Sequence, residues 1–391
     1  MLPRSCGKMI SNRNEGGSAM RIFLTGDNHI GLRYARHEQA AALASKRIEA
    51  LDRMVEIANR EDCGLFVVAG DLFENLRAAR RDIQAVLTKL SGFYGTVAVL
   101  PGNHDYYDRD SKFWQQFEEI AARMDNLVLL KEYRPYPLTI DGEDVVLYPA
   151  LCTSQHSAPG QNNLGWIARE VMAPDGTYRI GVAHGAVEGE TIDSEGQYFL
   201  MSRRELEQIG VDLWLIGHTH VPFPALGDDW TCGERIFNAG THVQTDVACN
   251  TDGQCFLIEL DRDRSVRARR VTTGNVRFRR MTMALSAGQM ERQLRASLDP
   301  LPDDSVVELI LSGAVTREEY ADRHALLARL LERFLEGSYS DSALSEVLSE
   351  ALIDAEFPET SFSAGLLKDL LDDPKEAQLC YELLKSMKEG K

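Results

Sequence analysis

The sequence lacks the features that a secreted, membrane-spanning or disulfide-stabilised protein would need. Its seven cysteines are scattered and include no C-x-x-C pair, so neither a disulfide framework nor a zinc knuckle is indicated. No apolar run approaches the roughly 20 residues that cross a bilayer, and the N-terminal segment has no apolar stretch typical of a secretory signal. We therefore expect a cytoplasmic protein that does not enter membranes, with residues 1–19 as a disordered leader.

Positive charge is also scarce. The chain has 43 lysines and arginines against 60 acidic residues, a net charge of -17. This balance argues against a protein that binds nucleic acid through bulk charge, so a polyanion would have to be held locally, by metal ions or a basic patch. Residues 284–391 are especially acidic, with 11 lysines and arginines against 22 aspartates and glutamates.

The length of 391 residues exceeds one comfortable core, which favours a large domain and a smaller one. Short apolar runs alternate with helical patterns in the first hundred residues, as in βαβ units. The predicted strands there are 21–25, 65–70 and 96–100, and the predicted helices lie near 37–60 and 77–91. Later strands are predicted at 145–150, 178–184, 213–220, 235–240, 255–260 and 265–271, with one helix at 202–209. The pattern predicts an α/β fold.

Composition shifts near residue 283, where we place a domain boundary. One further strand is predicted at 305–315. Residues 317–336 and 341–390 have the leucine spacing of amphipathic helices. The smaller domain, 284–391, is therefore expected to contain both a strand and helices.

Five polar segments each follow a predicted strand, where open α/β sheets place their chemistry. The segments are TGDNHIG (Asp27, His29), AGDLFE (Asp71), PGNHD (Asn103, His104, Asp105), VAHG (His184) and IGHTH (His218, His220). Oxygen and nitrogen donors without sulfur suit a pair of divalent metals, Mn(II) or Fe(II), with Zn(II) as an alternative. Asp71 stands alone in its segment and is the expected bridging carboxylate. The remaining histidines, His37, His156, His242 and His324, are expected not to bind metal.

In their order D-x-H, G-D, G-N-H-D, H and G-H-x-H, these segments resemble the calcineurin-like metallophosphoesterases over residues 20–283. The loops GDNHIG, GDLFE, GHTHVPF and NAGTHVQTD are most similar to the SbcD-type nuclease subunit of SbcCD double-strand-break repair exonucleases. The resemblance implies a four-layer αββα sandwich with a smaller α+β C-terminal domain.

The same resemblance assigns roles to the residues. It implies one metal held by Asp27, His29, Asp71 and His220, and a second held by Asp71, Asn103, His184 and His218. His104 would be the general acid for the leaving oxygen. Asp105 would orient the His104 ring, or else only cap its loop.

Basic and aromatic residues beside these segments are candidates for DNA binding. They are Arg33, Arg36, Arg77, Arg80, Arg81, Arg109, Lys112, Tyr106 and Tyr107. The arginine-rich stretch 262–280 is a candidate DNA-facing ribbon. Solvent-exposed helix and strand faces, and packing for the tyrosines, are the alternatives.

The resemblance implies a Mn(II)-dependent DNA exonuclease and endonuclease that processes double-strand breaks or hairpins. Its partners would be DNA and an SbcC-like coiled-coil ATPase, and the chain would form a homodimer within a heterotetramer. Residues 284–391 would form a capping domain that docks onto the partner. The alternative is a phosphoesterase with the same metal core that acts on a small molecule or a phosphoprotein. A binding scaffold with an inactive site is disfavoured, because no ligand is missing.

Overall fold

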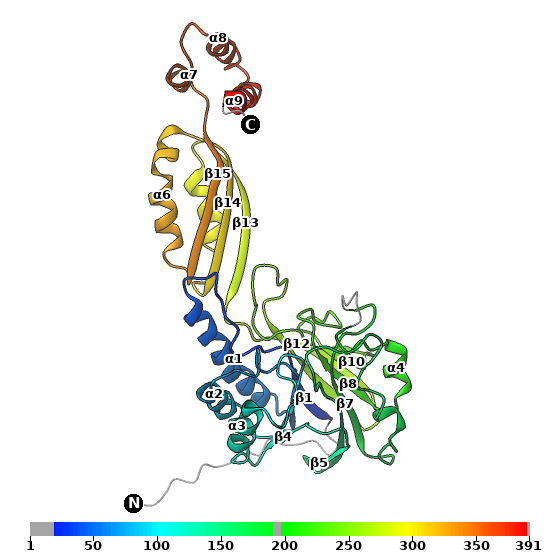
Figure 1. The fold of residues 1–391 in the computed structure, drawn as a ribbon. Helices are drawn as coiled ribbons and strands as arrows, with labels where there is room; N and C mark the ends of the chain where they lie inside the picture. Colours follow the sequence, from blue (N-terminus) through cyan, green and yellow to red (C-terminus); the bar gives the residue numbers. More distant parts are fainter. Residues whose placement is uncertain (1–18, 191–196, 389–391) are drawn as a thin grey trace, which may run out of the picture. The chain divides into compact units, whose positions relative to one another are not determined.

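The computed structural model describes residues 19–190 and 197–388, so most of the predicted leader lies outside the described residues (Figure 1). The chain divides into two compact units between Arg277 and Phe278. The boundary predicted near 283 instead falls inside strand β13 (Arg277–Ser286). No helix in the described ranges combines the length and the apolar character that crossing a membrane requires.

The first unit contains a seven-stranded sheet in the order β4-β3-β2-β1-β11-β12-β9. Its strands are β1 (Met20–Thr25), β2 (Leu65–Ala69), β3 (Thr96–Leu100), β4 (Leu127–Leu129), β9 (Thr231–Cys232), β11 (Gln254–Leu260) and β12 (Val266–Thr272). Strands β1 to β4 are parallel, and β11 pairs with β1 in the antiparallel direction. Every residue of β2 is buried, as expected for a parallel strand covered on both faces.

A five-stranded sheet, in the order β10-β8-β7-β6-β5, packs against the first. Its strands are β5 (Tyr136–Ile140), β6 (Glu143–Ala150), β7 (Tyr178–His184), β8 (Leu213–Gly217) and β10 (Ile236–Asn238). The shared core includes Ile22 and Val67 from one sheet and Val182 and Leu215 from the other. Strands β10, β8, β7 and β6 are parallel, so the two sheets both carry polar loops at carboxyl ends.

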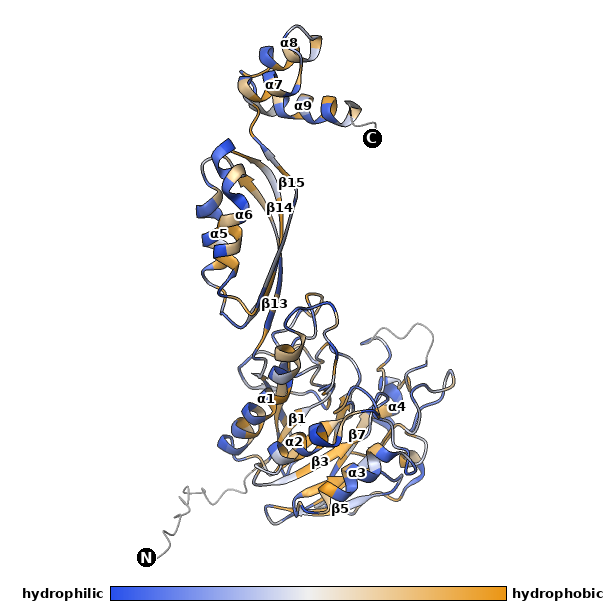
Figure 2. Cartoon of the chain, turned by 60° about the vertical axis from the view of Figure 1, so that its left-hand side comes forward, coloured by the Kyte–Doolittle hydropathy of each residue, from blue (hydrophilic) through white to orange (hydrophobic). Residues whose placement is uncertain are grey.

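Helices cover both outer faces of this sandwich. Helices α1 (Ala40–Arg60), α2 (Arg80–Leu90) and α3 (Lys112–Ala121) share a core with the seven-stranded sheet, where Phe23 and Phe66 point away from the other sheet. The short helices α4 (Arg203–Gln208) and η1 (Ile167–Arg169) cover the five-stranded sheet. Figure 2 shows hydrophobic residues concentrated on strands such as β3, while the helices carry both colours. The four-layer αββα prediction is confirmed.

The second unit contains a three-stranded sheet in the order β13-β14-β15, packed on two helices. The elements are β14 (Ser305–Val315), β15 (Glu336–Glu346), α5 (Met290–Leu298) and α6 (Arg317–Leu331). Three helices, α7 (Glu350–Glu356), α8 (Phe362–Asp369) and α9 (Pro374–Lys388), form a separate core around Ile353 and Leu367.

Strand β15 corrects the sequence prediction, which extended one helix to 336 and began another at 341. The segment pairs in parallel with β14 from Val306↔Glu336 to Val315↔Glu346. Helix α6 is the crossover that parallel neighbours require. Pairing with β14 therefore decides the conformation of a segment whose own hydrophobic pattern is weak.

Candidate metal centre

The structure brings all seven predicted metal ligands together at one edge of the sandwich. Asp27 and His29 follow β1, Asp71 follows β2, Asn103 follows β3, His184 ends β7, and His218 and His220 follow β8. Strand β2 contacts β7 and β8 across the core, which places the carboxyl ends of both sheets beside each other. Ligands that are nearly 200 residues apart therefore share one site.

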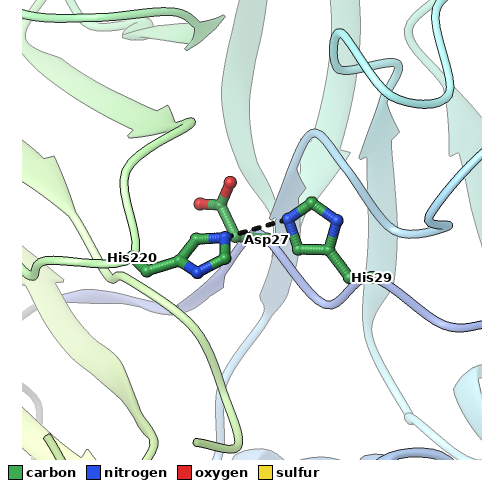
Figure 3. A group of neighbouring side chains, drawn as sticks. All are labelled: Asp27, His29 and His220. Carbon is green, nitrogen blue, oxygen red and sulfur yellow. Dashed lines mark hydrogen bonds between the residues drawn. The ribbon is translucent and has the colours of Figure 1, made fainter. Parts of the chain in front are cut away.

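The first group of ligands consists of Asp27, His29 and His220, whose ligand atoms all lie within 4.8 Å of one another. The Nε2 atoms of His29 and His220 lie 3.0 Å apart, and Figure 3 shows the two rings converging beside Asp27. Burial, with the charges of His29 and Arg47, lowers the pKa of His220 to about 4. His220 is therefore neutral at physiological pH, with a lone pair available for a cation.

The second group surrounds the side-chain oxygen of Asn103. Nε2 of His184 lies 2.9 Å from this oxygen and Nδ1 of His218 lies 3.1 Å from it. The other ring nitrogen of His184 donates to the Ala69 carbonyl at 2.8 Å. This bond fixes the tautomer that leaves Nε2 as a ligand, as is usual for metal-binding histidines.

Asp71 lies between the two groups. Its Oδ2 atom is 3.3 Å from Nε2 of His184 and 3.8 Å from Nε2 of His29. Its Oδ1 atom accepts the backbone N–H of His104 at 2.8 Å. One carboxylate thus reaches a histidine of each group, which is the position that a bridging ligand needs.

Burial makes the charges of the site interdependent. Burial, followed by the charge of Asp71, raises the pKa of Asp27 to about 8. Burial alone would raise the pKa of Asp71, but His184 holds it below its ordinary value. Burial would lower the pKa of His184, but Asp71 raises it to about 9. Protons on Asp27 and His184 therefore offset the negative charge of the site near neutral pH. Bound cations would replace those protons.

The donor set itself matches divalent cations. Carboxylate, amide and imidazole groups supply only oxygen and nitrogen atoms, and a nitrogen pair only 3.0 Å apart cannot carry two protons. These residues could hold two metal ions.

The ligand turns are conformationally strained. The φ angles of Asp27, His29 and Asp71 are 49°, 44° and 52°, in the left-handed region that non-glycine residues rarely adopt. Gly102 permits the close approach of the turn that carries Asn103 to the turn that carries Asp71, because a Cβ at Gly102 would lie 2.2 Å from Oδ1 of Asp71. At Gly26, by contrast, a Cβ would make only ordinary contacts, the nearest at 3.5 Å. The fold, rather than local preference, holds these ligands in place.

Glu74 is a site residue that the sequence analysis missed. Its Oε2 atom lies 2.9 Å from Nδ1 of His29, and its backbone carbonyl lies 3.0 Å from Nδ1 of His104. Glu74, His29 and His104 form a third group of close ligand atoms. Since His29 already directs Nε2 toward His220, Glu74 fits the role of a carboxylate that orients a metal ligand. The signal was an acidic residue three positions after Asp71.

Of the two roles expected for Asp105, the hydrogen bonds favour capping of its loop over orientation of the His104 ring. The buried Asp105 carboxylate accepts the backbone N–H groups of Gly102 at 2.7 Å and Phe73 at 3.0 Å. Both of its oxygens are thus used to hold the turn, and among the described residues the His104 ring is bonded to the Glu74 carbonyl instead. Asp105 positions the loop that carries Asn103 and His104.

Two adjoining cavities of about 500 and 490 Å³ are both lined by Leu32, Arg33, Glu74 and His104. The first also contains His29, Arg36 and His220. The second also contains Arg77 and Tyr106. Four of the candidate DNA contacts therefore line cavities that contain His104, and two of them, Arg33 and Arg36, share a cavity with the candidate ligands His29 and His220.

Other candidate DNA contacts are placed differently. Tyr107 packs its ring 5.5 Å from that of Trp114 and donates its hydroxyl to Glu118 at 2.9 Å, so it is a structural residue. Arg109 is exposed but lines neither cavity. Arg80 is held by Glu119 through two contacts of 2.7 Å.

The arginine-rich stretch 262–280 does not form a free basic ribbon. Arg269 pairs with Glu61 at 3.0 Å and Arg270 with Asp228 at 3.0 Å. Further pairs join Arg262, Arg264, Arg267 and Arg280 to Glu143, Asp212, Glu259 and Glu308. The chain's own carboxylates neutralise much of this stretch, which favours the solvent-face alternative.

Among the described residues, the four histidines expected not to bind metal belong neither to a group of close ligand atoms nor to the Asn103 group. His242 is buried, and its Nε2 lies 3.0 Å from the carbonyl of Arg47. His37 lines the first cavity, and His324 belongs to the second unit, where its Nδ1 contacts the Tyr339 hydroxyl.

The comparison with protein families agrees with this geometry. The model of the calcineurin-like phosphoesterase family matches residues 20–222. Among solved structures, TT1561 of Thermus thermophilus is similar at 12% identity and TM-score 0.38, over 66% of this chain and 100% of that one. A dimetal phosphatase from Danio rerio is similar at 12% identity and TM-score 0.38, over 66% of this chain and 99% of that one. The comparison with curated proteins found no match.

Proposed function

This chain belongs to the calcineurin-like phosphoesterase family, a family of hydrolases that act on phosphate esters, and from that premise we propose that it is a metal-dependent DNA nuclease. The proposed reaction is hydrolysis of a phosphodiester in DNA ends or hairpins. Mn(II) is the proposed metal, because an oxygen and nitrogen donor set without sulfur suits it, with Fe(II) or Zn(II) as alternatives.

The observation that carries the proposal is that two adjoining cavities, which share Leu32, Arg33 and Glu74, are both lined by His104, so that space for a substrate extends beyond a single pocket. A phosphodiester has a chain on both sides of its phosphorus, whereas a phosphomonoester extends on one side only. Arg33 and Arg36 line one cavity, and Arg33 and Arg77 line the other, where they can neutralise flanking phosphates. Tyr106 offers a ring for an unpaired base in the second cavity.

His104 is the proposed general acid. Its Nδ1 atom is held by the carbonyl of Glu74, which leaves Nε2 as the ring nitrogen that can donate a proton to the leaving oxygen. Asp105 keeps the turn in place, so that Asn103 and His104 face the site together. Two divalent cations, held by the Asp27–His29–His220 and Asn103–His184–His218 groups with Asp71 between them, would supply an activated water and charge neutralisation.

The three C-terminal helices are the proposed docking site for an SbcC-like coiled-coil ATPase. Leu379, Leu383 and Met387 recur every four residues along α9 and are 60%, 57% and 75% exposed, and Phe362 of α8 is 82% exposed. Exposed apolar side chains that recur along one helix are typical of a surface that another protein covers. A homodimer within a heterotetramer, and a cytoplasmic location, belong to the same proposal and rest on the sequence resemblance.

The test compares two substrates in Mn(II): end-labelled duplex or hairpin DNA, and a small aryl phosphomonoester. We expect DNA cleavage that weakens steeply between about 50 and 200 mM salt. His104→Ala should lower the cleavage rate by roughly 10²- to 10⁴-fold while both metals remain bound. Turnover of the monoester without any DNA cleavage would reject the nuclease and favour the small-molecule alternative.

The docking proposal has its own test. Leu383→Asp should abolish co-purification with a coiled-coil ATPase while DNA cleavage by the isolated chain is retained. Leu384 lies on the same helix but is partly buried against the core of the three C-terminal helices. Leu384→Asp is therefore expected to unfold these helices, and its thermal melting shows what a folding defect looks like in comparison with a docking defect. Unchanged ATPase binding by Leu383→Asp would reject this face as the docking surface.

A further inference from the structure

Arg47 is the only buried arginine or lysine in the part of the chain that the structure describes, and it lies directly behind the metal ligands. It belongs to α1 and is 1% exposed. No carboxylate among the described residues forms an ion pair with it. An unpaired buried charge is unfavourable for stability, and apolar residues commonly replace such groups without loss. The groups that Arg47 binds, which are backbone carbonyls and a hydroxyl near the metal ligands, indicate what it does.

The guanidinium group binds one carbonyl with two of its nitrogens. Nε and Nη2 of Arg47 donate to the Asn28 oxygen at 3.1 and 2.6 Å. Asn28 is the residue between the ligands Asp27 and His29, both of which have positive φ angles. The Asn28 carbonyl belongs to the peptide that leads into His29, so a two-pronged contact on its oxygen restrains the turn that carries both ligands.

The same guanidinium group also binds the segment that follows β10. Nη2 donates to the Thr241 hydroxyl at 3.2 Å, and Nη1 donates to the carbonyl of Val243 at 3.1 Å. The Thr241 hydroxyl in turn donates to the Asp27 carbonyl at 3.0 Å. Arg47 therefore fixes the Asp27–His29 turn both directly and through Thr241, by joining loops that follow strands of different sheets.

We propose that Arg47 is a positioning residue for the metal ion of the Asp27–His29–His220 group, which acts by holding the Asn28 carbonyl and the Thr241 hydroxyl. The inference rests on the proposed two-metal site but does not depend on the substrate. Arg47 touches neither metal ligand side chain nor substrate. Its effect is on the geometry, and hence the affinity, of one ion of the pair.

Arg47→Lys is the informative substitution, because lysine keeps the charge but cannot form the planar two-pronged contact. Metal-free protein would be titrated with MnCl₂ in a calorimeter. We expect one ion to bind as in the wild type and the other to bind about 10- to 100-fold more weakly, the usual effect of losing a residue that orients metal ligands. Arg53→Lys, an exposed arginine of the same helix, is the matched control and should bind both ions normally.

A second variant covers the case in which Arg47→Lys does not fold. Thr241→Val preserves shape but removes the hydroxyl that links Arg47 to Asp27, and it should weaken the same ion. The proposal is overturned if a folded Arg47→Lys or Thr241→Val protein binds both ions with wild-type affinity. In that case the loss of thermal stability would be the same with and without Mn(II), as expected for a residue that only stabilises the fold. If the wild type binds two ions but cleaves no DNA, the nuclease fails while the role of Arg47 stands.

Discussion

The ring nitrogens Nε2 of His29 and Nε2 of His220 face each other at 3.0 Å, although the two histidines follow strands of different sheets. Two imidazole nitrogens at this distance either share one proton or bind a common cation. Burial and the charges of His29 and Arg47 keep the pKa of His220 low, at about 4, so His220 stays neutral above that pH and keeps a lone pair for a cation. The pair is thus suited to a metal ion.

Metal stabilisation should therefore increase with pH. In the metal-free protein the pKa of Asp27 is about 8 and that of His184 about 9, both above their ordinary values. Between the ordinary pKa values of these groups, 3.8 and 6.5, and the raised values, the folded state binds more protons than the unfolded state. The stability of the metal-free protein therefore falls as pH rises toward 8 to 9. Metal ions displace these protons. We expect the increase in melting temperature caused by Mn(II) to be larger at pH 8 than at pH 6, as measured by thermal denaturation.

The control for this experiment is the same titration with Mg(II), which accepts histidine ligands poorly and should stabilise the protein less. A shift caused by Mn(II) that is the same at both pH values would contradict the assignment of Asp27 and His184 as ligands.

Glu74→Gln should weaken metal binding more than it alters the fold. The substitution replaces the carboxylate oxygen 2.9 Å from Nδ1 of His29 with an amide, while the backbone carbonyl that holds His104 is unchanged. We expect a loss of metal affinity of about 10- to 100-fold, measured by calorimetric titration with Mn(II). Glu38→Gln, at an exposed position, is the control. Normal affinity with slower cleavage would instead assign Glu74 to His104 alone.

The convergence of the seven candidate ligands could be predicted from sequence because each one follows or ends a strand in a short polar segment. The partner of His104 could not be predicted, since its Nδ1 contacts the backbone carbonyl of Glu74, which any residue type would supply, and not the carboxylate of Asp105. The choice between them depends on a turn in which the N–H groups of Gly102 and Phe73 point at Asp105. Such a turn is set by the packing of two loops, which no local pattern shows.

Long-range partners explain the other differences. The sequence leaves open whether the arginines of 262–280 face DNA or solvent, because it does not show that Arg269 contacts Glu61, about 200 residues away along the chain. Likewise, GSYSDSALSE becomes part of β15 only because β14 offers a free edge beside it. Charge and hydropathy patterns identify elements and cannot identify which distant group will neutralise or pair with them.

Asp105→Asn tests the corrected role of Asp105. The new amide must direct its NH₂ group at one of two backbone N–H donors, so one buried donor loses its acceptor. We expect unfolding to become easier by about 1–3 kcal/mol, measured by urea denaturation of the metal-free protein. Asp108→Asn is the control, because Asp108 is exposed and caps only its own loop. Unchanged stability with a large fall in DNA cleavage would return Asp105 to a role at the His104 ring.

Gly102→Ala should separate metal binding from folding. A Cβ at Gly102 would lie 2.2 Å from Oδ1 of Asp71 and 2.3 Å from the backbone nitrogen of Asp71, and the backbone nitrogen cannot turn away as a side chain could. The Asp71 turn must move, and a carboxylate that reaches both ligand groups cannot move without loosening one of them. We expect metal analysis after dialysis to show fewer than two ions per chain. Gly26→Ala, whose Cβ meets only ordinary contacts, should retain both ions, and a Gly102→Ala protein that also retains both would show that Asp71 is not shared.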